Sequence, residues 1–466
     1  MVFRQLAEGI EGAIAGMTGA LTEPVLRLGV TGLARAGKTV FITSLIANLM
    51  DRGRMPQLSA APRITAAYLQ PQPDMTLPRF DYEAHLAALT APAPHWPAST
   101  RAVSELRLSL RYRPSGFLSA LGGLRTLHLD IIDYPGEWLL DLALLDKDYA
   151  AWSEATLERI AARKEAAGFM AMARAEDGSL GLEEPVAQRL AAAFTAYLAA
   201  ARDGGWSDCT PGRFLLPGDL AGSPVLTFAP LPRPATTPRG SLWSEMARRY
   251  EAYRAQVVRP FFRDHFARID RQVVLVDVLG AVHAGPAAFE DLRRTMAEVM
   301  AAFRPGRNGW LTQLLGGRRV ERLLIAATKA DHLHHTDHAK LTAITAALLR
   351  EARDRADFAG ARAEAMSLAA LRSTTEEMRE HGGEPLGMVR GTLLATGKAV
   401  ALYPGALPDD PGRLLTPARQ GAEGWLDGDF GLMAFAPAPL RLKPGEGPPH
   451  IRLDRAAEFL IGDRLG

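Results

Sequence analysis

The feature that most constrains this chain is a short stretch containing glycine and lysine near its N-terminal end. Residues 32–39 read GLARAGKT and match the spacing G-x-x-x-x-G-K-T. An apolar run at residues 25–30 precedes the stretch, and apolar residues at helical spacing follow it as far as Leu49. The pattern therefore predicts a phosphate-binding loop, or P-loop, between a buried strand and a helix.

The spacing of this loop has a physical reason. Successive backbone N–H groups must curl around an anion, and side chains at Gly32 and Gly37 would block that approach or forbid the required dihedral angles. Lys38 brings a charge to the β- and γ-phosphates, and Thr39 offers its hydroxyl to Mg²⁺ where the positive end of the helix dipole meets the phosphates. A glycine-containing turn that binds no ligand is the alternative. The residues expected around the phosphates are Gly32, Ala34, Arg35, Ala36, Gly37, Lys38, Thr39 and Val40.

Length and composition are those of a globular protein with an ample core. The 466 residues are 47% hydrophobic and 23% charged, which predicts two or three domains. The formal net charge of +2 gives no overall field that would attract nucleic acid. Only seven of the 54 basic residues are lysine, yet lysine stands at position 38, where a compact ammonium is needed.

The sequence predicts a cytoplasmic location. The single cysteine, Cys209, cannot form an internal disulfide and indicates a reducing compartment. Residues 1–24 read as an amphipathic helix and not as a signal peptide, and the acidic polar face of that helix disfavours membrane contact. No apolar run approaches the roughly 20 residues that span a bilayer, so we expect peripheral membrane association at most.

A second motif lies at the end of a predicted strand over residues 126–132. Asp133 and Gly136 have the spacing D-x-x-G, in which the aspartate steadies Mg²⁺ and the glycine amide can turn toward a γ-phosphate. A second D-x-x-G, from Asp277 to Gly280, follows another apolar run, which predicts a strand over residues 273–279. We favour the first because it follows a predicted partner strand and precedes the segment where a switch helix should lie.

A third motif follows the predicted strand at residues 322–327. Thr328, Lys329 and Asp331 have the spacing T-K-x-D, in which the carboxylate accepts two hydrogen bonds from guanine and the lysine stem lies against the base. Adenine presents the opposite pattern there, so the motif predicts selection of guanine nucleotides over ATP. A threonine and an aspartate that cap a helix are the alternative.

Two weaker patterns follow this motif. A predicted last strand at residues 363–371 ends near Ala370 and Leu371, where a backbone loop could close over guanine. The second pattern is a group of four histidines between Asp331 and this last strand. Their spacing is not regular for metal binding, and no cysteine or ordered carboxylate completes a set of ligands, so we expect a solvated helix start. These histidines are His332, His334, His335 and His338.

The remaining sequence divides the chain around the motifs. Residues 138–270 are alanine-rich and mainly helical, with a predicted helix at residues 242–269 whose aromatic stripe is typical of a core. This segment interrupts the P-loop core as a large insertion. The tail contains a predicted hairpin at residues 386–402. The predicted divisions are an N-terminal helix at 1–24, a first core part at 25–137, the insertion at 138–270 and a second core part at 271–375. An extension with a small β region and a final helix follows at 376–466.

In their order, these motifs resemble a Ras-like GTPase core. More closely, the chain resembles the YcjX-like family of bacterial stress-associated P-loop GTPases. The resemblance implies a P-loop NTPase α/β fold with a mostly parallel sheet flanked by helices, GTP or GDP with Mg²⁺ as ligands, and a helical insertion. The stretches that carry it are GLARAGKTVFITSLIANL at 32–49, WPASTR at 96–101, DIIDYPGEWLLDL at 130–142 and HIRLDRAAEFLIGDRL at 450–465.

The resemblance also implies residue roles. Thr100 would join Thr39 as a ligand of Mg²⁺, although Ser99 fits the same loop, and Asp133 would act on the metal through water. Gly136 would sense the γ-phosphate. Glu137 stands where Ras-like proteins usually carry the glutamine that orients water, and a carboxylate is repelled by phosphate. We therefore expect slow hydrolysis unless a protein partner or Arg101, acting as an internal arginine finger, supplies positive charge.

The sequence is compatible with three functions. The first is a GTPase that acts as a stress-associated molecular switch on an unknown protein effector through the insertion. The second is an ATPase or phosphotransferase that uses the insertion as a substrate lid. The third is a scaffold that holds its nucleotide without hydrolysis.

Overall fold

The computed structural model describes residues 23–33, 35–98, 102–115, 123–301, 320–348, 350, 362–420, 425–426 and 430–466. Most of the predicted N-terminal helix lies outside these ranges. So do four predicted site residues: Ala34, Ser99, Thr100 and Arg101. Within the described ranges, no helix is both long and apolar enough to cross a membrane.

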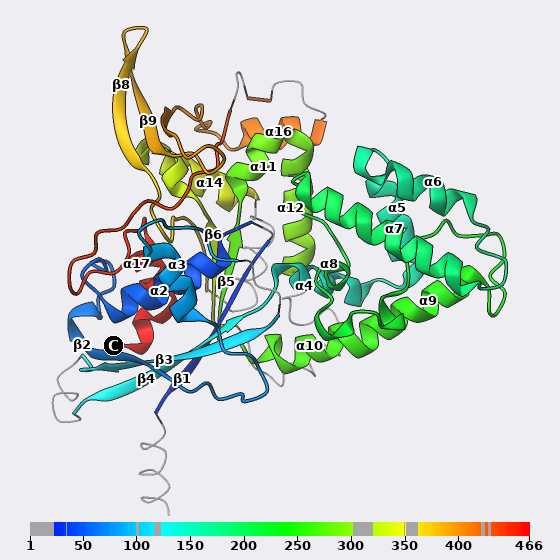
Figure 1. The fold of residues 1–466 in the computed structure, drawn as a ribbon, viewed down its shortest axis with the longest axis horizontal. Helices are drawn as coiled ribbons and strands as arrows, with labels where there is room; N and C mark the ends of the chain where they lie inside the picture. The colour runs from blue at the N-terminus through cyan, green and yellow to red at the C-terminus, as the bar shows by residue number, and fades with distance from the viewer. Residues whose placement is uncertain are drawn as a thin grey trace, which may run out of the picture.

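A seven-stranded sheet forms the centre of the molecule (Figure 1). Its order is β2-β3-β4-β1-β5-β6-β7, with parallel pairing from β4 to β7 and antiparallel pairing of β3 with β2 and β4. The P-loop strand β1 therefore lies between β4 and β5. The strands are β1 Val25–Gly32, β2 Ile64–Gln70, β3 Ser104–Tyr112, β4 Arg125–Asp133, β5 Arg271–Val276, β6 Arg322–Ala327 and β7 Arg362–Ser367.

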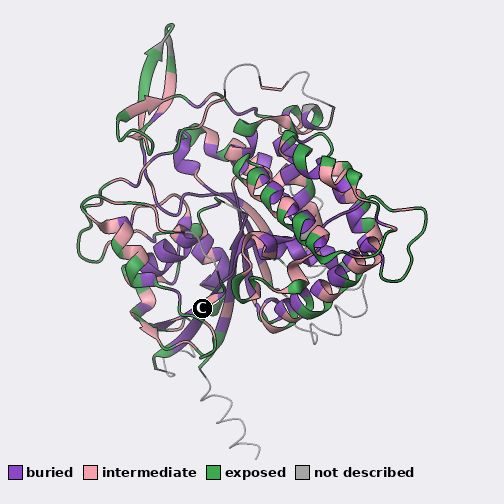
Figure 2. Cartoon of the chain, turned by 45° about the vertical axis from the view of Figure 1, so that its right-hand side comes forward, coloured by how far each residue is buried: buried purple, intermediate pink, exposed green. Residues whose placement is uncertain are grey.

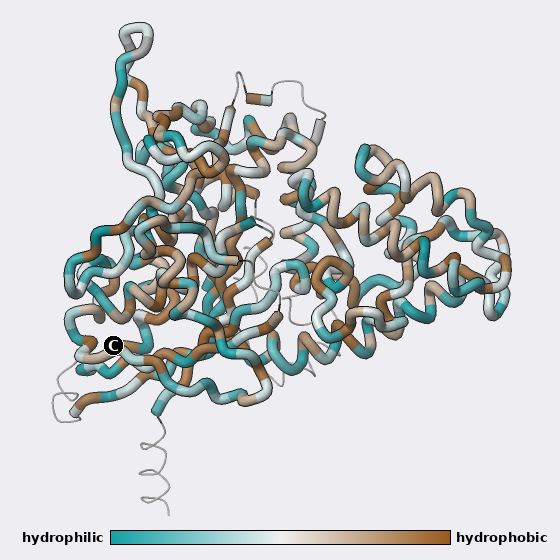
Figure 3. Tube along the Cα trace, in the orientation of Figure 1, coloured by the Kyte–Doolittle hydropathy of each residue, from teal (hydrophilic) through white to brown (hydrophobic). Residues whose placement is uncertain are grey.

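Both faces of this sheet are buried. In β5, Val274 and Val276 belong to one hydrophobic cluster, whereas Val273 and Leu275 belong to another. Successive side chains of a strand point to opposite faces, so the two clusters are the cores on either side of the sheet. Figure 2 shows buried residues concentrated along the central strands, and Figure 3 shows hydrophobic residues there. This arrangement is the predicted P-loop NTPase α/β fold.

One face is covered by α2, α3 and the C-terminal helix α17 (Figure 1). Phe41 of α2 and Leu460 of α17 are fully buried in the same cluster, although they are far apart in the sequence. Helices from the middle of the chain cover the other face. The helices outside the β4–β5 connection are α2 Lys38–Met50, α3 Tyr82–Thr90, α11 Val278–Ala284, α12 Pro286–Ala301, α14 His338–Leu348, α16 Gly412–Gln420 and α17 Leu453–Ile461.

The connection from β4 to β5 is fully described and forms helices but no strand. It extends away from the sheet in Figure 1. Its core contains Trp152 stacked on Tyr250, with ring centroids 4.9 Å apart, so the predicted aromatic stripe does form a core. The helices of this connection are α4 Gly136–Leu140, α5 Tyr149–Ile160, α6 Ala167–Ala175, α7 Glu184–Asp203, α8 Gly212–Leu215, α9 Leu242–Tyr253 and α10 Arg259–Asp264.

The predicted helix over residues 242–269 forms as far as Asp264, but not as one regular α-helix. Helix α9 ends at Tyr253, a π-helical turn covers Arg254–Val258, and α10 ends at Asp264. Pro260 in the first turn of α10 has no N–H to donate to the preceding turn, which widens the helix at that point.

Two predicted strands extend too far. The strand at 273–279 stops at Val276, because the Asp277 carboxylate accepts a hydrogen bond from the Gly280 amide at 2.9 Å and caps α11. The strand at 363–371 stops at Ser367. Beyond it, Ala369 and Ile451 exchange backbone hydrogen bonds of 3.1 and 2.8 Å, so the chain turns toward the C-terminal segment instead.

A separate three-stranded sheet follows the core in the order β10-β9-β8. The predicted hairpin at 386–402 forms from β9 Glu384–Thr392 and β10 Ala399–Leu402, which pair antiparallel. The sequence prediction missed β8 Thr375–His381, which forms a second hairpin with β9. Gly382 and Gly383 form its turn with φ angles of 63° and 87°, which glycine adopts without strain. The hairpin projects from the body of the molecule in Figure 1 and is largely exposed in Figure 2.

Candidate functional site

The P-loop runs from the end of β1 to the start of α2. Arg35 and Gly37 have φ angles of 66° and 75°, so two backbone units of this loop are left-handed and turn the amides to one side. Helix α2 begins at Lys38, followed by Thr39 and Val40, with no acidic residue in its first turn to neutralise the positive end of the helix. Anion binding is the chemistry that this geometry favours.

Gly32 has no room for a side chain. A Cβ atom there would lie 2.9 Å from Leu275 Cβ, 3.0 Å from the Leu275 carbonyl oxygen and 3.2 Å from Ala36 Cβ. The Leu33 amide donates to the Leu275 carbonyl at 3.3 Å. The first glycine of the loop therefore lets the chain lie directly against β5.

Lys38 joins the P-loop to the end of β4. Its Nζ lies 2.6 Å from Asp133 Oδ1 and 2.6 Å from the carbonyl oxygen of Tyr134. The side chains of Lys38 and Asp133 are 10% and 1% exposed, and Asp133 pairs with Val30 in the sheet. Of the predicted Mg²⁺ residues, Asp133 thus lies at the end of β4, and Thr39 lies in the first turn of α2, which follows the adjacent strand β1. They supply oxygen ligands, which Mg²⁺ prefers, so these residues fit that ion.

Gly136 lies directly on the P-loop. A Cβ atom at Gly136 would be 1.5 Å from the carbonyl oxygen of Gly32 and 3.3 Å from the Leu33 nitrogen. The glycine of the D-x-x-G motif therefore makes a contact between two backbones that no other residue permits. The preceding Tyr134 is fully buried, and its hydroxyl donates to Gln272 Oε1 at 3.1 Å, which anchors the segment.

The same contact continues into the helical connection. A Cβ atom at Gly212 of α8 would be 1.9 Å from the carbonyl oxygen of Glu137. Next to it, the Trp138 indole donates to the Leu216 carbonyl at 3.0 Å, and the Arg213 guanidinium lies 3.2 Å from the centre of the Trp138 ring. Helix α4, which begins at Gly136, is thus fixed between the P-loop and α8.

A buried carboxylate holds α4 and α8 together. Asp141 Oδ1 accepts a hydrogen bond from the Gly212 amide at 2.7 Å, and Asp141 Oδ2 accepts one from the Tyr253 hydroxyl at 2.5 Å. Burial raises the pKa of Asp141 from 3.8 to about 6, against these hydrogen bonds and the nearby Arg213, which lower it.

This pKa predicts a pH-dependent stability. Between about pH 4 and pH 6 the folded chain keeps the Asp141 proton while the unfolded chain loses it, so the stability falls as pH rises. The difference in pKa corresponds to about 3 kcal/mol. The variant Asp141→Asn keeps an oxygen for Gly212 but cannot ionise. The quantity to measure is the free energy of unfolding of the variant minus that of the native chain, obtained from urea titrations at several pH values. We expect this difference to increase by about 3 kcal/mol from about pH 4 to pH 6. A difference that stays constant with pH would contradict the prediction.

A cleft of about 420 Å³ lies beside the P-loop. Arg35 and Asp203, the last residue of α7, lie on its walls 3.5 Å apart, but both are mostly exposed and their pairing contributes little. Glu137, which is half-buried, also lines the cleft. Other lining residues come from both sides of the cleft: Leu33, Arg202, Trp206, Asp277, Lys329 and Leu432.

The T-K-x-D motif follows β6 on the same side of the sheet. The Thr328 amide donates to the Val276 carbonyl at 3.0 Å, and Lys329 is left-handed with φ 62°. The Lys329 ammonium forms an ion pair with Asp277, which explains the second D-x-x-G: its aspartate caps α11 and holds this lysine.

The Asp331 carboxylate is buried and oriented by the loop after β7. Asp331 is 3% exposed, and its Oδ2 accepts hydrogen bonds from the Ser373 amide at 2.8 Å and the Ser373 hydroxyl at 2.6 Å. The Thr374 hydroxyl donates to the Asp331 carbonyl. Ala370 and Leu371 lie in the same loop and are buried, but Ser373 is the residue that contacts the carboxylate. Our sequence prediction missed this role because a serine after a strand carries no pattern of its own.

The loop before β3 contacts the C-terminal segment. The Trp96 indole donates to the Phe435 carbonyl at 2.8 Å, and the Phe435 ring packs on His332 with centroids 5.2 Å apart. The predicted switch residues that follow Trp96 lie outside the described residues.

The prediction of a solvated start of a helix is wrong for three of the four histidines, whereas His335 is exposed. His332, His334 and His338 are 8%, 6% and 3% exposed, and His338 Nε2 lies 2.8 Å from the Ala330 carbonyl oxygen. A carboxylate does approach the group, because β8 brings Glu376 from a distant part of the sequence to His335.

Comparison with known proteins places the chain in a family. The sequence pattern described as "YcjX-like family, DUF463" matches residues 26–465. The chain is similar to a protein of Escherichia coli (strain K12) named Ras-like GTPase YcjX, with 37% identity over 458 residues, 94% of this chain and 96% of the relative. A protein of that name from Shewanella oneidensis is 36% identical over 468 residues, 94% of each chain. The P-loop, the D-x-x-G and the T-K-x-D of this chain each follow a strand of one sheet. The chain therefore belongs to the YcjX-like family.

Proposed function

We propose that this chain binds guanine nucleotides and hydrolyses GTP to GDP and phosphate slowly, in the presence of Mg²⁺, as a molecular switch. The names of the two relatives support a GTPase. The observation that carries the proposal is topological: the P-loop, Asp133 with Gly136, and Lys329 with Asp331 follow the parallel strands β1, β4 and β6 at one side of the sheet. In open α/β sheets ligands bind at this side.

The phosphates would lie at the start of α2. Lys38, which now contacts Asp133, would turn to the β- and γ-phosphates, and the backbone of the loop would donate to their oxygens. Thr39 and Asp133 would hold Mg²⁺, which supplies positive charge to the phosphates when bound.

The base would lie against Lys329 with its edge at Asp331. The two bonds from Ser373 hold the carboxylate in one orientation before the nucleotide arrives. Guanine can donate two hydrogen bonds to this carboxylate, whereas ATP would leave a buried charge unpaired.

Hydrolysis would be slow because the cleft beside the P-loop holds the Glu137 carboxylate. A negative group at this position repels the γ-phosphate and the hydroxide-like water that attacks it. A protein partner, or Arg101, would have to supply the missing positive charge.

The helical connection would be the output of the switch. A shift of Gly136 toward a γ-phosphate has to move Glu137 and Trp138, and these contact Gly212 and Arg213 of α8 directly. Bound GTP and bound GDP would therefore favour different positions of the helices. The proposal also includes a protein effector that binds one of these positions of the helices, a cytoplasmic location and a role in stress. These three points rest on the family resemblance.

Two measurements on the purified chain test the proposal. The first is a titration with labelled GDP and with labelled ADP, and the second is the rate of phosphate release from GTP with and without Mg²⁺. We expect binding of GDP, much weaker binding of ADP, and slow phosphate release that requires Mg²⁺. Equal affinities would favour the ATPase or phosphotransferase. Binding of GTP without any phosphate release would favour the scaffold.

A further inference from the structure

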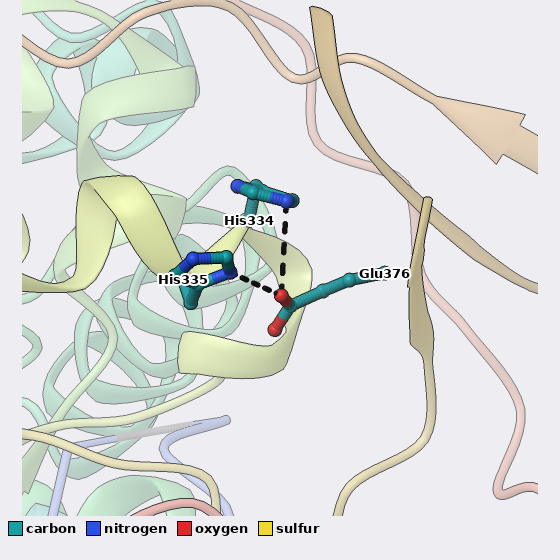
Figure 4. Close-up of side chains that lie close together, drawn as sticks. All are labelled: His334, His335 and Glu376. Atoms are coloured by element: carbon teal, nitrogen blue, oxygen red, sulfur yellow. Dashed lines mark hydrogen bonds and ion pairs between the residues drawn. The ribbon is translucent and has the colours of Figure 1, made fainter. Parts of the chain in front are cut away.

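A second group of ligand-type side chains lies beyond the guanine loop. His334 and His335 lie at the start of a 3₁₀ turn, His335–Asp337, that leads into α14, and Glu376 lies on β8 (Figure 4). His335 Nδ1 is 2.6 Å from Glu376 Oε2, and His334 Nε2 is 3.8 Å from the same oxygen. Within the described ranges this is the one group of three histidine, cysteine or acidic residues whose ligand atoms lie within 4.8 Å of one another.

Two further contacts orient these ligands. His334 Nδ1 lies 3.0 Å from the Thr336 hydroxyl, so donation from Nδ1 to that oxygen leaves the Nε2 lone pair directed at Glu376. The other oxygen of Glu376, Oε1, accepts a hydrogen bond from Arg372 at 3.1 Å. Histidine and carboxylate ligands of metals are typically held by partners of this kind.

The group is closed on one side and open on the other. A Cβ atom at Gly387 of β9 would lie 2.7 Å from His334 Cγ, so the hairpin packs directly on this ring. The His334 side chain is 7% exposed, whereas that of His335 is 65% exposed. An ion could enter from the His335 side and keep water as a further ligand.

A simple ion pair does not account for both histidines. The two rings are 4.2 Å apart between centroids, so two imidazolium charges would repel each other. A metal ion uses both rings in their neutral form.

We propose that His334, His335 and Glu376 bind one divalent transition-metal ion, with Zn²⁺ as the ion that best fits two imidazoles and one carboxylate. The ion would fasten the β8–β9 hairpin to the segment that follows Asp331. Ser373 and Thr374, which bond to Asp331, directly precede β8. The site would thus stabilise the loop that orients the Asp331 carboxylate.

The full chain without an affinity tag, freed of metal by a chelator, provides the test. It would be equilibrated with Zn²⁺ or Co²⁺ in the presence of excess Mg²⁺ and GDP, which occupy the P-loop. We expect about one equivalent of Zn²⁺ to be retained and Co²⁺ to give visible absorption bands of low coordination number. The measurement does not depend on GTP hydrolysis, so it can fail while the proposed GTPase function holds.

Variants make the assignment specific. Glu376→Gln and His335→Ala should lower the Zn²⁺ affinity by more than about 100-fold, and Thr336→Val by roughly 10-fold. Glu380→Gln, an exposed carboxylate on the same strand, is the matched control and should bind as the native chain does. His335 is exposed, so its removal should leave the metal-free melting temperature unchanged. The proposal would be overturned if the native chain and Glu376→Gln retain Zn²⁺ equally, or if neither retains it. His335 and Glu376 would then be a hydrogen-bonded pair that binds no metal.

Discussion

Gly136→Ala is expected to lower the rate of GTP hydrolysis by roughly 10²-fold, because a displacement of about 1 Å at a reacting centre can have an effect of this size. The added Cβ would lie 1.5 Å from the Gly32 carbonyl oxygen, far inside van der Waals contact. Gly32 is held by its pairing with Leu275 of β5, so residues from Tyr134 onward would have to move. We therefore expect the affinity for GDP to change less than the hydrolysis rate measured in a single turnover.

A matched control exists for this variant. Gly168 lies in helix α6, where a Cβ atom would meet no other atom within 4 Å. Gly168→Ala should hydrolyse GTP at the native rate and be slightly more stable, since alanine favours a helix. Hydrolysis by Gly136→Ala within twofold of the native rate would show that the contact with Gly32 plays no part in the reaction.

Asp331→Asn is expected to lower the affinity for GDP by roughly 10²- to 10⁴-fold, the equivalent of two hydrogen bonds to a charged group. Ser373 donates two hydrogen bonds to one oxygen of the carboxylate. An asparagine would keep its carbonyl oxygen there and turn its NH₂ group to the base, where guanine also donates. Xanthine presents a carbonyl oxygen at that position, so the variant should prefer xanthosine diphosphate.

Competition between labelled GDP and xanthosine diphosphate measures this exchange. Asp337→Asn, in the same segment and paired with Lys340 at 3.1 Å, should keep the native preference. If Asp331→Asn binds GDP as tightly as the native chain, the carboxylate does not contact the base. If it loses both nucleotides and melts early, the bonds from Ser373 support only the fold.

The sequence predicts the parts of this structure that depend on short-range patterns. The strand at 322–327 was predicted with the bounds observed, because a continuous run of apolar residues there ends at a clear turn signal. The predictions of the YcjX-like family and the P-loop NTPase fold are confirmed as well. The specific roles of the site residues stay predictions.

The parts that could not be predicted depend on residues far apart in the chain. Ser373 lies 42 residues after Asp331, and Glu376 lies 41 residues after His335. No local periodicity links such pairs, since only the fold brings them together. The π-helical turn before α10 was missed for the opposite reason: the apolar period continues through it, and only Pro260 marks the change.

The contact of Gly212 with Glu137 has a consequence for experiments on the helical connection. Alanine scanning deletes side chains, but this contact is made by main-chain atoms that no deletion removes. A scan across α8 would remove the Arg213 guanidinium from the Trp138 ring but would leave the contact between the two backbones in place. Substitutions that add volume at positions without a side chain are the ones that would reveal the connection.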